Sequence, residues 1–173
     1  MTLPSHGKDP QFESGQNHYM YKTQIQMVIK IGKSSTNKKM HYSVGAIIEK
    51  NKKYLIIDRA IFPYGYAGIA GHIDIEDKTP GYAIKREIKE ESGYSAKNCN
   101  LLFKEEIENN PCSRGASTHY WYLYKCEVSG RIKQNKKETK LIGWYTKQQI
   151  QKLYKQKKLE PVWEYWFKKL NII

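Results

Sequence analysis

Three glutamates, Glu87, Glu90 and Glu91, lie close together in the chain. Their spacing is i, i+3 and i+4, so in a helix they share one face. Like charges at this spacing repel, at a cost of roughly 0.2–0.5 kcal/mol per pair. A divalent cation removes the repulsion, and Mg²⁺ commonly joins protein carboxylates to the phosphates of a substrate. The spacing therefore indicates metal-assisted attack on a phosphate.

The segment that carries these glutamates has the start and stop signals of a helix. Thr79 suits the N-cap, Pro80 suits the first helical position, and Gly93 can adopt the left-handed conformation that ends a helix. An apolar stripe on the same segment would pack on a core, and it comprises Ala83, Ile84 and Ile88. The alternative, a solvated face of a Glu- and Lys-rich helix, is disfavoured because such a string is rare at average amino-acid usage.

Residues 71–94 resemble the Nudix box of the Nudix hydrolases, G-x5-E-x7-R-E-U-x-E-E-x-G-U, where U is a bulky apolar residue. The second half matches at every defined position: Arg86, Glu87, Ile88, Glu90, Glu91, Gly93 and Tyr94. The first half departs from the pattern by one extra residue in the loop before the helix. With Gly71 as the box glycine, Asp77, or less favourably Glu76, takes the place of the first glutamate.

The resemblance implies an α/β fold of the Nudix type, an α/β/α sandwich with a mixed β-sheet. It also implies a metal-dependent pyrophosphohydrolase that acts on a nucleoside diphosphate linked to another group, with Mg²⁺ or Mn²⁺ as cofactor. Carried over residue by residue, the implied metal ligands are Gly71, through its carbonyl, and the carboxylates of Glu87, Glu90 and Glu91. Glu90 and Glu91 are also candidate catalytic groups, and Arg86 is expected to orient a glutamate. The number of ions and the identity of the general base stay open.

A fourth catalytic carboxylate is expected from Glu138. In similar proteins such a group precedes the last strand, and here it stands just before the segment 141–145, which contains Trp144. The opposing interpretation, a surface acid among lysines, has equal weight. Weaker rivals lie on or near an earlier strand, where alternation would point them to different faces; they are Glu105, Glu106 and Glu108.

Substrate-binding residues are predicted from weaker signals. Arg59 and Arg114 stand out in a Lys-rich chain, and arginine binds phosphate oxygens in a bidentate manner. Tyr64, Tyr66 and His119 are candidates to clamp a base, although alternate residues near His119 must also fill the core. The other histidines, His41 and His72, are interpreted as structural.

The length of 173 residues predicts one domain, residues 23–173, after a flexible leader, residues 1–22. Strands are expected at 24–31, 42–49, 54–60, 99–107, 119–128 and 141–145, and further helices at 147–157 and 161–170. No run approaches the ~20 apolar residues of a membrane span, so a soluble, cytoplasmic protein is expected.

The three cysteines, Cys99, Cys112 and Cys126, are expected to be reduced thiols. Their separations of 13 and 14 residues do not match the spacing of a zinc site. A zinc ion is therefore not predicted.

The net charge of +13 favours polyanionic partners. Lysines crowd residues 30–53 and 131–158, so RNA is an alternative partner to a small nucleotide, and an RNA 5′-end pyrophosphohydrolase or decapping activity is an alternative function. A basic nucleic-acid-binding protein and a non-catalytic Nudix-like nucleotide-binding module are further alternatives. The intact glutamates argue against the last. A Lys-rich solvated surface would explain the charge without any such partner.

Overall fold

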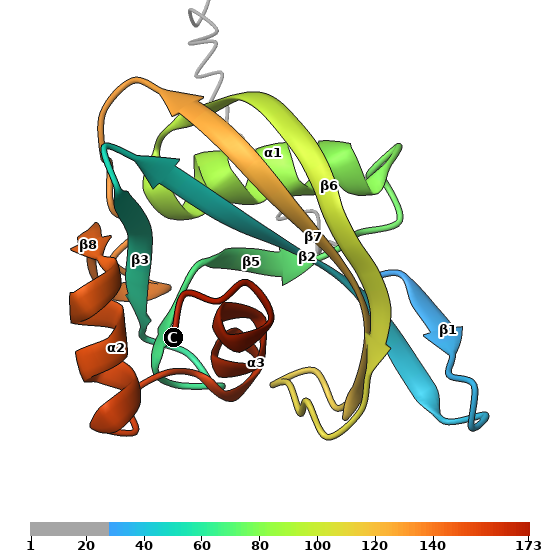
Figure 1. The fold of residues 1–173 in the computed structure, drawn as a ribbon. Coiled ribbons are helices and arrows are strands. Elements are labelled where there is room, and N and C mark those ends of the chain that lie inside the picture. The colour runs from blue at the N-terminus through green and yellow to red at the C-terminus, as the bar shows by residue number, and fades with distance from the viewer. Residues whose placement is uncertain (1–27) are drawn as a thin grey trace, which may run out of the picture.

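A mixed sheet and three helices make up the described part of the chain, residues 28–173 of a computed structural model (Figure 1). In chain order the elements are β1 (Ile31–Lys33), β2 (Lys39–Lys50), β3 (Lys53–Arg59), β4 (Tyr66–Ala67), β5 (Ile69–His72), α1 (Pro80–Ser92), β6 (Ser95–Ile107), β7 (Thr118–Ser129), β8 (Thr139–Thr146), α2 (Lys147–Lys155) and α3 (Pro161–Lys169). The predicted leader and most of the first predicted strand lie outside the described residues.

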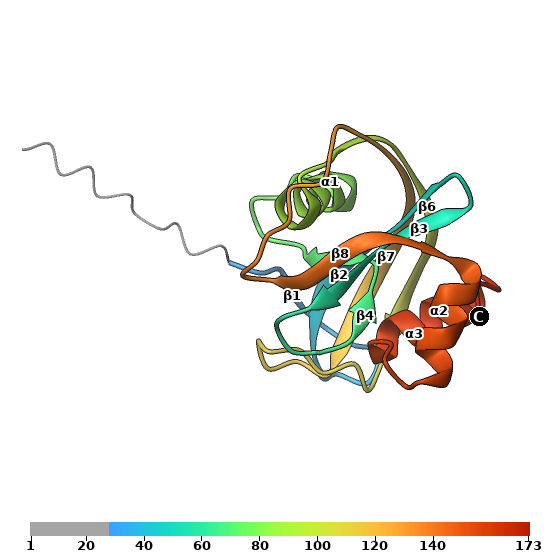
Figure 2. The same ribbon diagram turned by 90° about the vertical axis from the view of Figure 1, so that its left-hand side faces the viewer.

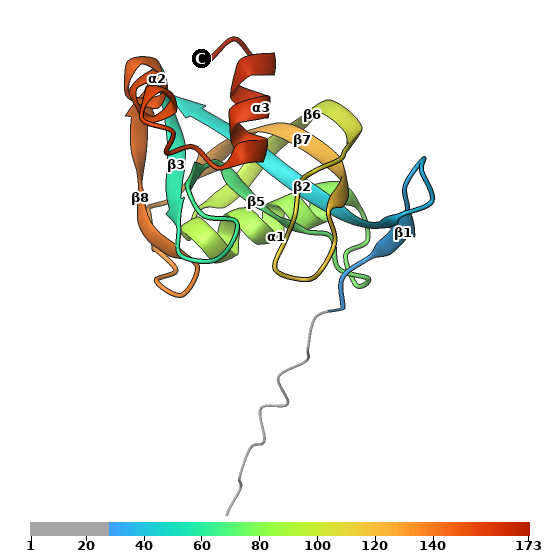
Figure 3. The same cartoon turned by 90° about the horizontal axis from the view of Figure 1, so that it is seen from below.

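Strand β2 is the centre of the sheet. It pairs in parallel with β7 and antiparallel with β1, β3 and β5, while β6 extends the sheet beyond β7 and β8 pairs with β3. Helix α1 lies on one side of the sheet, and α2 and α3 lie on the other (Figures 1, 2 and 3). This arrangement confirms the predicted α/β class with a mixed sheet between helices.

Helix α1 begins and ends at the predicted residues. The hydroxyl of Thr79 accepts a hydrogen bond from the N–H of Tyr82 at 3.1 Å, and Pro80 occupies the first turn. Gly93 has a φ of 77° and closes the helix by donating its N–H to the carbonyl of Lys89. The predicted apolar stripe is completely buried: Ala83, Ile84 and Ile88. The helix is thus held against the sheet by one face, which leaves the glutamate face to line a site.

The core on the other side of the sheet is aromatic. Trp163, Trp166 and Phe167 of α3 are all buried against it, and Leu123 of β7 is buried beneath them. Strand β2 reads as a nearly continuous apolar run because both of its faces are covered by helices. Within residues 28–173, no helix has the length and apolar content that crossing a membrane would require.

The prediction of reduced thiols is wrong for two of the three cysteines. Cys99 and Cys126 are joined by a disulfide, and Cys112 is free. The bridge links neighbouring strands, since the two residues are partners in the antiparallel register of β6 and β7. The separation of 27 residues along the chain gives no sign of that register, so spacing alone could not predict the bridge.

Candidate active site

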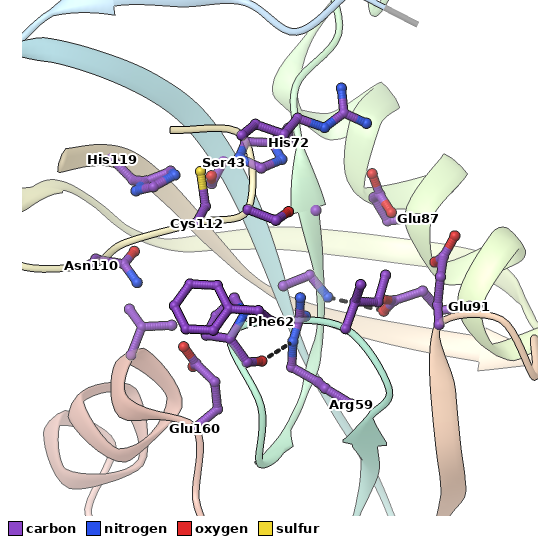
Figure 4. Close-up of a pocket in the computed structure, with 18 of the residues that line it drawn as sticks. Ser43, Arg59, Phe62, His72, Glu87, Glu91, Asn110, Cys112, His119 and Glu160 are labelled. Atoms are coloured by element: carbon purple, nitrogen blue, oxygen red, sulfur yellow. Dashed lines mark hydrogen bonds between the residues drawn. The ribbon is translucent and has the colours of Figure 1, made fainter. Parts of the chain in front are cut away.

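A cavity of about 350 Å³ lies where α1, the end of β5 and the start of α3 come together (Figure 4). The four carboxylates singled out in the sequence all line it: Glu87, Glu90, Glu91 and Glu138. Glu87 and Glu91 lie on one side of the cavity, and His119 and Cys112 lie on the other. The fold therefore brings the helix face predicted to bind metal into a concave site.

The three helical glutamates differ in their exposure. Glu87 and Glu91 are buried, whereas the Glu90 side chain is 45% exposed at the cavity edge. One Glu91 oxygen, Oε2, accepts a hydrogen bond from the N–H of Ala70 at 3.2 Å. A Cβ at Gly71 would overlap the Glu87 carboxylate, so only glycine lets the β5 backbone come this close to the glutamate. Gly71 and these glutamates line the same cavity.

The buried carboxyl groups of Glu87 and Glu91 hold their protons more strongly than exposed ones. Burial raises the pKa of Glu87 to about 7, against the lowering effect of Arg86. Burial and the charge of Glu87 together raise the pKa of Glu91 well above its ordinary value, and Glu138 raises both pKa values further. Clustered carboxylates of this kind fit a hard divalent cation such as Mg²⁺ or Mn²⁺, which takes oxygen ligands.

Arg86 holds the loop after β5 against α1. Its Nε and Nη2 donate to the two Asp77 oxygens at 3.1 and 2.7 Å, its Nη1 donates to Glu87 at 2.8 Å, and its Nη2 donates to the His72 carbonyl at 3.0 Å. Burial opposes the charge on Arg86, yet Asp77 and Glu87 raise its pKa above its ordinary value. Asp77 pairs with Arg86 at 2.7 Å, while Glu76, the other candidate for the place of the first box glutamate, is exposed.

Glu138 approaches the cavity from the loop before β8, which is held in place by a 2.8 Å hydrogen bond from the Ala60 N–H to the Glu138 carbonyl. Its rivals are engaged elsewhere and do not line the cavity. Glu105 binds Lys169, Glu106 binds Ser35, and Glu108 binds Thr36. The geometry favours Glu138.

The predicted substrate-binding residues divide into two groups. Arg59, Arg114 and His119 line the cavity, and the Arg59 Nε donates to the Pro63 carbonyl at 2.7 Å. Two predicted aromatic residues do not line it: Tyr64 is 60% exposed and Tyr66 packs on Tyr145. A turn-rich sequence does not reveal which ring faces inward, and the aromatic side chain that this turn presents to the cavity is Phe62 (Figure 4).

Glu160 is a cavity residue that the sequence analysis missed. It is the N-cap of α3, where its Oε2 accepts a hydrogen bond from the Trp163 N–H at 3.1 Å, while its Oε1 is buried without a hydrogen-bond partner in the described structure. Burial raises its pKa to about 7. A glutamate before Pro161 could have been identified as a helix start, but not as part of the cavity.

The raised pKa of Glu160 predicts a pH-dependent stability. Its folded value of about 7 exceeds the ordinary 4.5, so the stabilisation is fully present below pH 4.5 and is lost as pH rises through 7. Glu160→Gln keeps the helix cap and removes the charge. We therefore expect the free energy of unfolding of this variant to exceed that of wild type by about 1–3 kcal/mol at pH 8 and to match it near pH 5. Urea unfolding at both pH values measures this. Glu164→Gln, an exposed control, should show no such pH-dependent difference, and an equal effect of Glu160→Gln at both pH values would contradict the assignment.

Histidines form the far wall of the cavity. Burial lowers the pKa of His72 to about 3 and that of His119 to about 4, so both rings are neutral at pH 7. The free thiol of Cys112 lies 3.5 Å from Nδ1 of His41. The separations between the cysteines gave no sign of zinc, but the fold places Cys112 among three histidines.

Comparisons with known proteins agree with this geometry. A family model described as NUDIX domain matches residues 39–167. A NUDIX hydrolase from Nitrosomonas europaea superposes with a TM-score of 0.62 at 19% identity, covering 76% of this chain and 88% of that one. A MutT NUDIX hydrolase from Burkholderia pseudomallei superposes with a TM-score of 0.56 at 21% identity, covering 64% of this chain and 85% of that one. The NUDIX domain of Shewanella oneidensis NrtR, complexed with ADP ribose, superposes with a TM-score of 0.56 at 15% identity, covering 66% of this chain and 77% of that one. A comparison with curated proteins finds no match. At these identities the structural likeness establishes the fold alone.

Proposed function

We propose a substrate class and residue roles for this chain, which belongs to the Nudix family and is a Nudix pyrophosphohydrolase. Its substrate is a small nucleoside diphosphate linked to another group, and its cofactor is Mg²⁺ or Mn²⁺. The observation that carries the proposal is the convergence of the α1 glutamates and Glu138 on one cavity. Because Glu87, Glu90 and Glu91 are all present, the proposal favours an enzyme over a non-catalytic binding module. Cytoplasmic location stays a prediction.

Each group has a role that follows from its position. Glu87, Glu90 and Glu91, with the Gly71 carbonyl, would hold the cation, which would supply charge neutralisation and a water of lowered pKa. Glu138 stands on a separate loop at the cavity and accepts the proton of the attacking water. Arg86 positions Glu87 through its 2.8 Å contact. Water adds across the P–O–P bond, so a nucleoside monophosphate and a second phosphate ester leave.

The opposite part of the cavity suits the remainder of the substrate. Arg59 and Arg114 line it and provide guanidinium groups for the non-reacting phosphate. Phe62 offers a ring face for a base or sugar. The volume of about 350 Å³ falls in the range of small-molecule sites. The similar NrtR domain was complexed with ADP ribose, which makes ADP-ribose the first compound to test.

A salt series with two substrates tests the choice between a small nucleotide and an RNA end. Each lysine contact to an RNA backbone releases counterions, so kcat/KM on a 5′-triphosphorylated oligonucleotide would fall steeply with salt. We expect ADP-ribose or another small substrate to be preferred and to show a shallow dependence. A clear preference for the oligonucleotide with a steep slope would replace the proposed substrate by the RNA 5′ end.

Mg²⁺ is expected to stabilise the folded protein. An ion at 100 times its Kd that binds only the folded state adds about 2.7 kcal/mol, which for a chain of this size raises Tm by about 5–10 °C. Burial and the neighbouring charge of Glu87 both disfavour an ionised Glu91 in the metal-free protein, and a bound cation would offset both effects. Thermal unfolding with Mg²⁺, compared with NaCl at equal ionic strength, measures the shift. EDTA should reverse it, and an unchanged Tm at millimolar Mg²⁺ and Mn²⁺ would contradict a cation at this face.

A further inference from the structure

Three histidines and one cysteine lie together beside the cavity, and three of the four line it: His72, Cys112 and His119. His41 comes from β2, His72 from the end of β5, His119 from the start of β7, and Cys112 from the loop 108–117. One candidate ligand atom from each of the four residues lies within 4.8 Å of the others. Figure 4 shows the Cys112 sulfur beside the His72 ring, across the cavity from Glu87.

The register of the sheet explains why the rings converge. His41 is the direct partner of His119 in the parallel pair β2 and β7, and His72 is the partner of Ser43, two residues after His41. Residues two apart on a strand point to the same face, so the three rings share one face of three neighbouring strands. Their ring centroids are 5.3 to 5.5 Å apart.

The ring nitrogens are poorly satisfied without a ligand. Three buried nitrogens have no hydrogen-bond partner among the described residues: His41 Nε2, His72 Nε2 and His119 Nδ1. Each such nitrogen has lost the hydrogen bond that it would form with water, which destabilises the folded protein. His119 also hydrogen-bonds the backbone of Asn110, and since its Nδ1 has no partner, this bond uses the other nitrogen. A histidine that binds a metal commonly holds a backbone carbonyl with its second nitrogen in this way.

We propose that His41, His72, His119 and Cys112 form a zinc site, separate from the carboxylate face of α1. Three imidazoles and a thiolate suit Zn²⁺, which takes four such ligands in a tetrahedron, whereas Mg²⁺ requires oxygen ligands. Zn–N and Zn–S bonds of about 2.0–2.3 Å place tetrahedral ligand atoms about 3.3–3.8 Å apart. The four candidate ligand atoms lie within 4.8 Å of one another, so the farthest pair needs to close by about 1 Å.

With four protein ligands the site is closed, which is typical of a structural rather than a catalytic zinc. Its effect is to fasten the loop 108–117 to the sheet through Cys112. That loop also carries Arg114 to the cavity, two residues beyond the cysteine. The two metals would therefore occupy opposite sides of one cavity, separated by their ligand chemistry.

Metal analysis of the full chain, prepared without a polyhistidine tag and under a phosphine reductant, tests the site. After equilibration with Zn²⁺ and excess Mg²⁺, we expect about one zinc per wild-type chain. Co²⁺ in its place should give visible bands of a tetrahedral ion and a near-ultraviolet thiolate-to-cobalt band. Cys112→Ser should lose both the stoichiometric zinc and the thiolate band. Glu90→Gln and the neighbouring Ser113→Ala should keep them.

Retention of the Mg²⁺-dependent rise in Tm by Cys112→Ser shows that this variant is folded. Equal zinc content in wild type and Cys112→Ser would overturn the proposal, as would Co²⁺ bands without a thiolate contribution. Zinc loss in Glu90→Gln instead would assign the ion to the carboxylate face. None of these readouts depends on hydrolysis, so the zinc site can fail while the proposed activity stands, and the reverse is equally distinguishable.

Discussion

Glu90→Gln and Glu91→Gln are each expected to lower turnover by about 10²–10³-fold while the fold stays intact. Glu90 lies at the cavity edge, where its Oε2 is 3.2 Å from Nη1 of Arg86, and it contributes little to packing. Glu91 is buried, but a glutamine oxygen can still accept the hydrogen bond from Ala70. Because burial raises the pKa of Glu91, removing its charge should not destabilise the metal-free protein.

Steady-state kinetics at saturating Mg²⁺, together with a urea unfolding curve for each variant, measures both parts of this expectation. Glu164→Gln is the matched control, since Glu164 forms an exposed pair with Lys168 on α3 and does not line the cavity. Its turnover should equal that of wild type, because exposed pairs of this kind contribute only about 0–1 kcal/mol. Wild-type turnover in both Glu90→Gln and Glu91→Gln would defeat the assignment of the site.

Gly71→Ala is expected to lower turnover by about 10²-fold, since displacing a catalytic group by about 1 Å has effects of this size. The added Cβ would overlap the Glu87 carboxylate, so either the β5 backbone or Glu87 must move. Overpacking of this kind costs about 1–3 kcal/mol of stability. The Mg²⁺-dependent rise in Tm should shrink as well, because Glu87 and the Gly71 carbonyl belong to the same proposed ligand set.

Gly81→Ala is the control for this substitution. Gly81 lies in the first turn of α1, and a Cβ there would meet its nearest atoms at 3.7 and 3.9 Å. Alanine at such a helical position should stabilise the protein by about 0.4–1 kcal/mol and leave turnover unchanged. Full activity with an unreduced Tm rise in Gly71→Ala would show that the close approach of β5 to Glu87 has no role.

The features that the sequence predicted well are those encoded locally. The cap at Thr79, the stop at Gly93 and the glutamate face all follow from neighbours along one helix, and the structure has each of them. Glu138 was found only through the family resemblance, because nothing near it in the chain distinguishes it from a surface acid. Arg59 and Arg114 were predicted from residue type and both line the cavity.

The features that could not be predicted from the sequence depend on strand register or on the path of a loop. The Cys99–Cys126 bridge and the histidine cluster arise from pairing between strands that are distant in the chain. Phe62 rather than Tyr64 faces the cavity because of the course of one turn, which residue types do not determine. Such positions follow from tertiary contacts, for which local propensity and periodicity carry no signal.

We propose that the carboxylate face of α1 uses a divalent cation to hydrolyse the pyrophosphate bond of a small nucleotide derivative. The most direct test is the release of AMP from ADP-ribose, within a panel of nucleotides, by wild type and Glu90→Gln in Mg²⁺, in Mn²⁺ and in EDTA. We expect monophosphate release from at least one small substrate by wild type with either metal, none in EDTA, and strongly reduced release by Glu90→Gln. Hydrolysis that persists in EDTA, or that is equal in the variant, would contradict it, as would an inactive wild type across the whole panel with both metals.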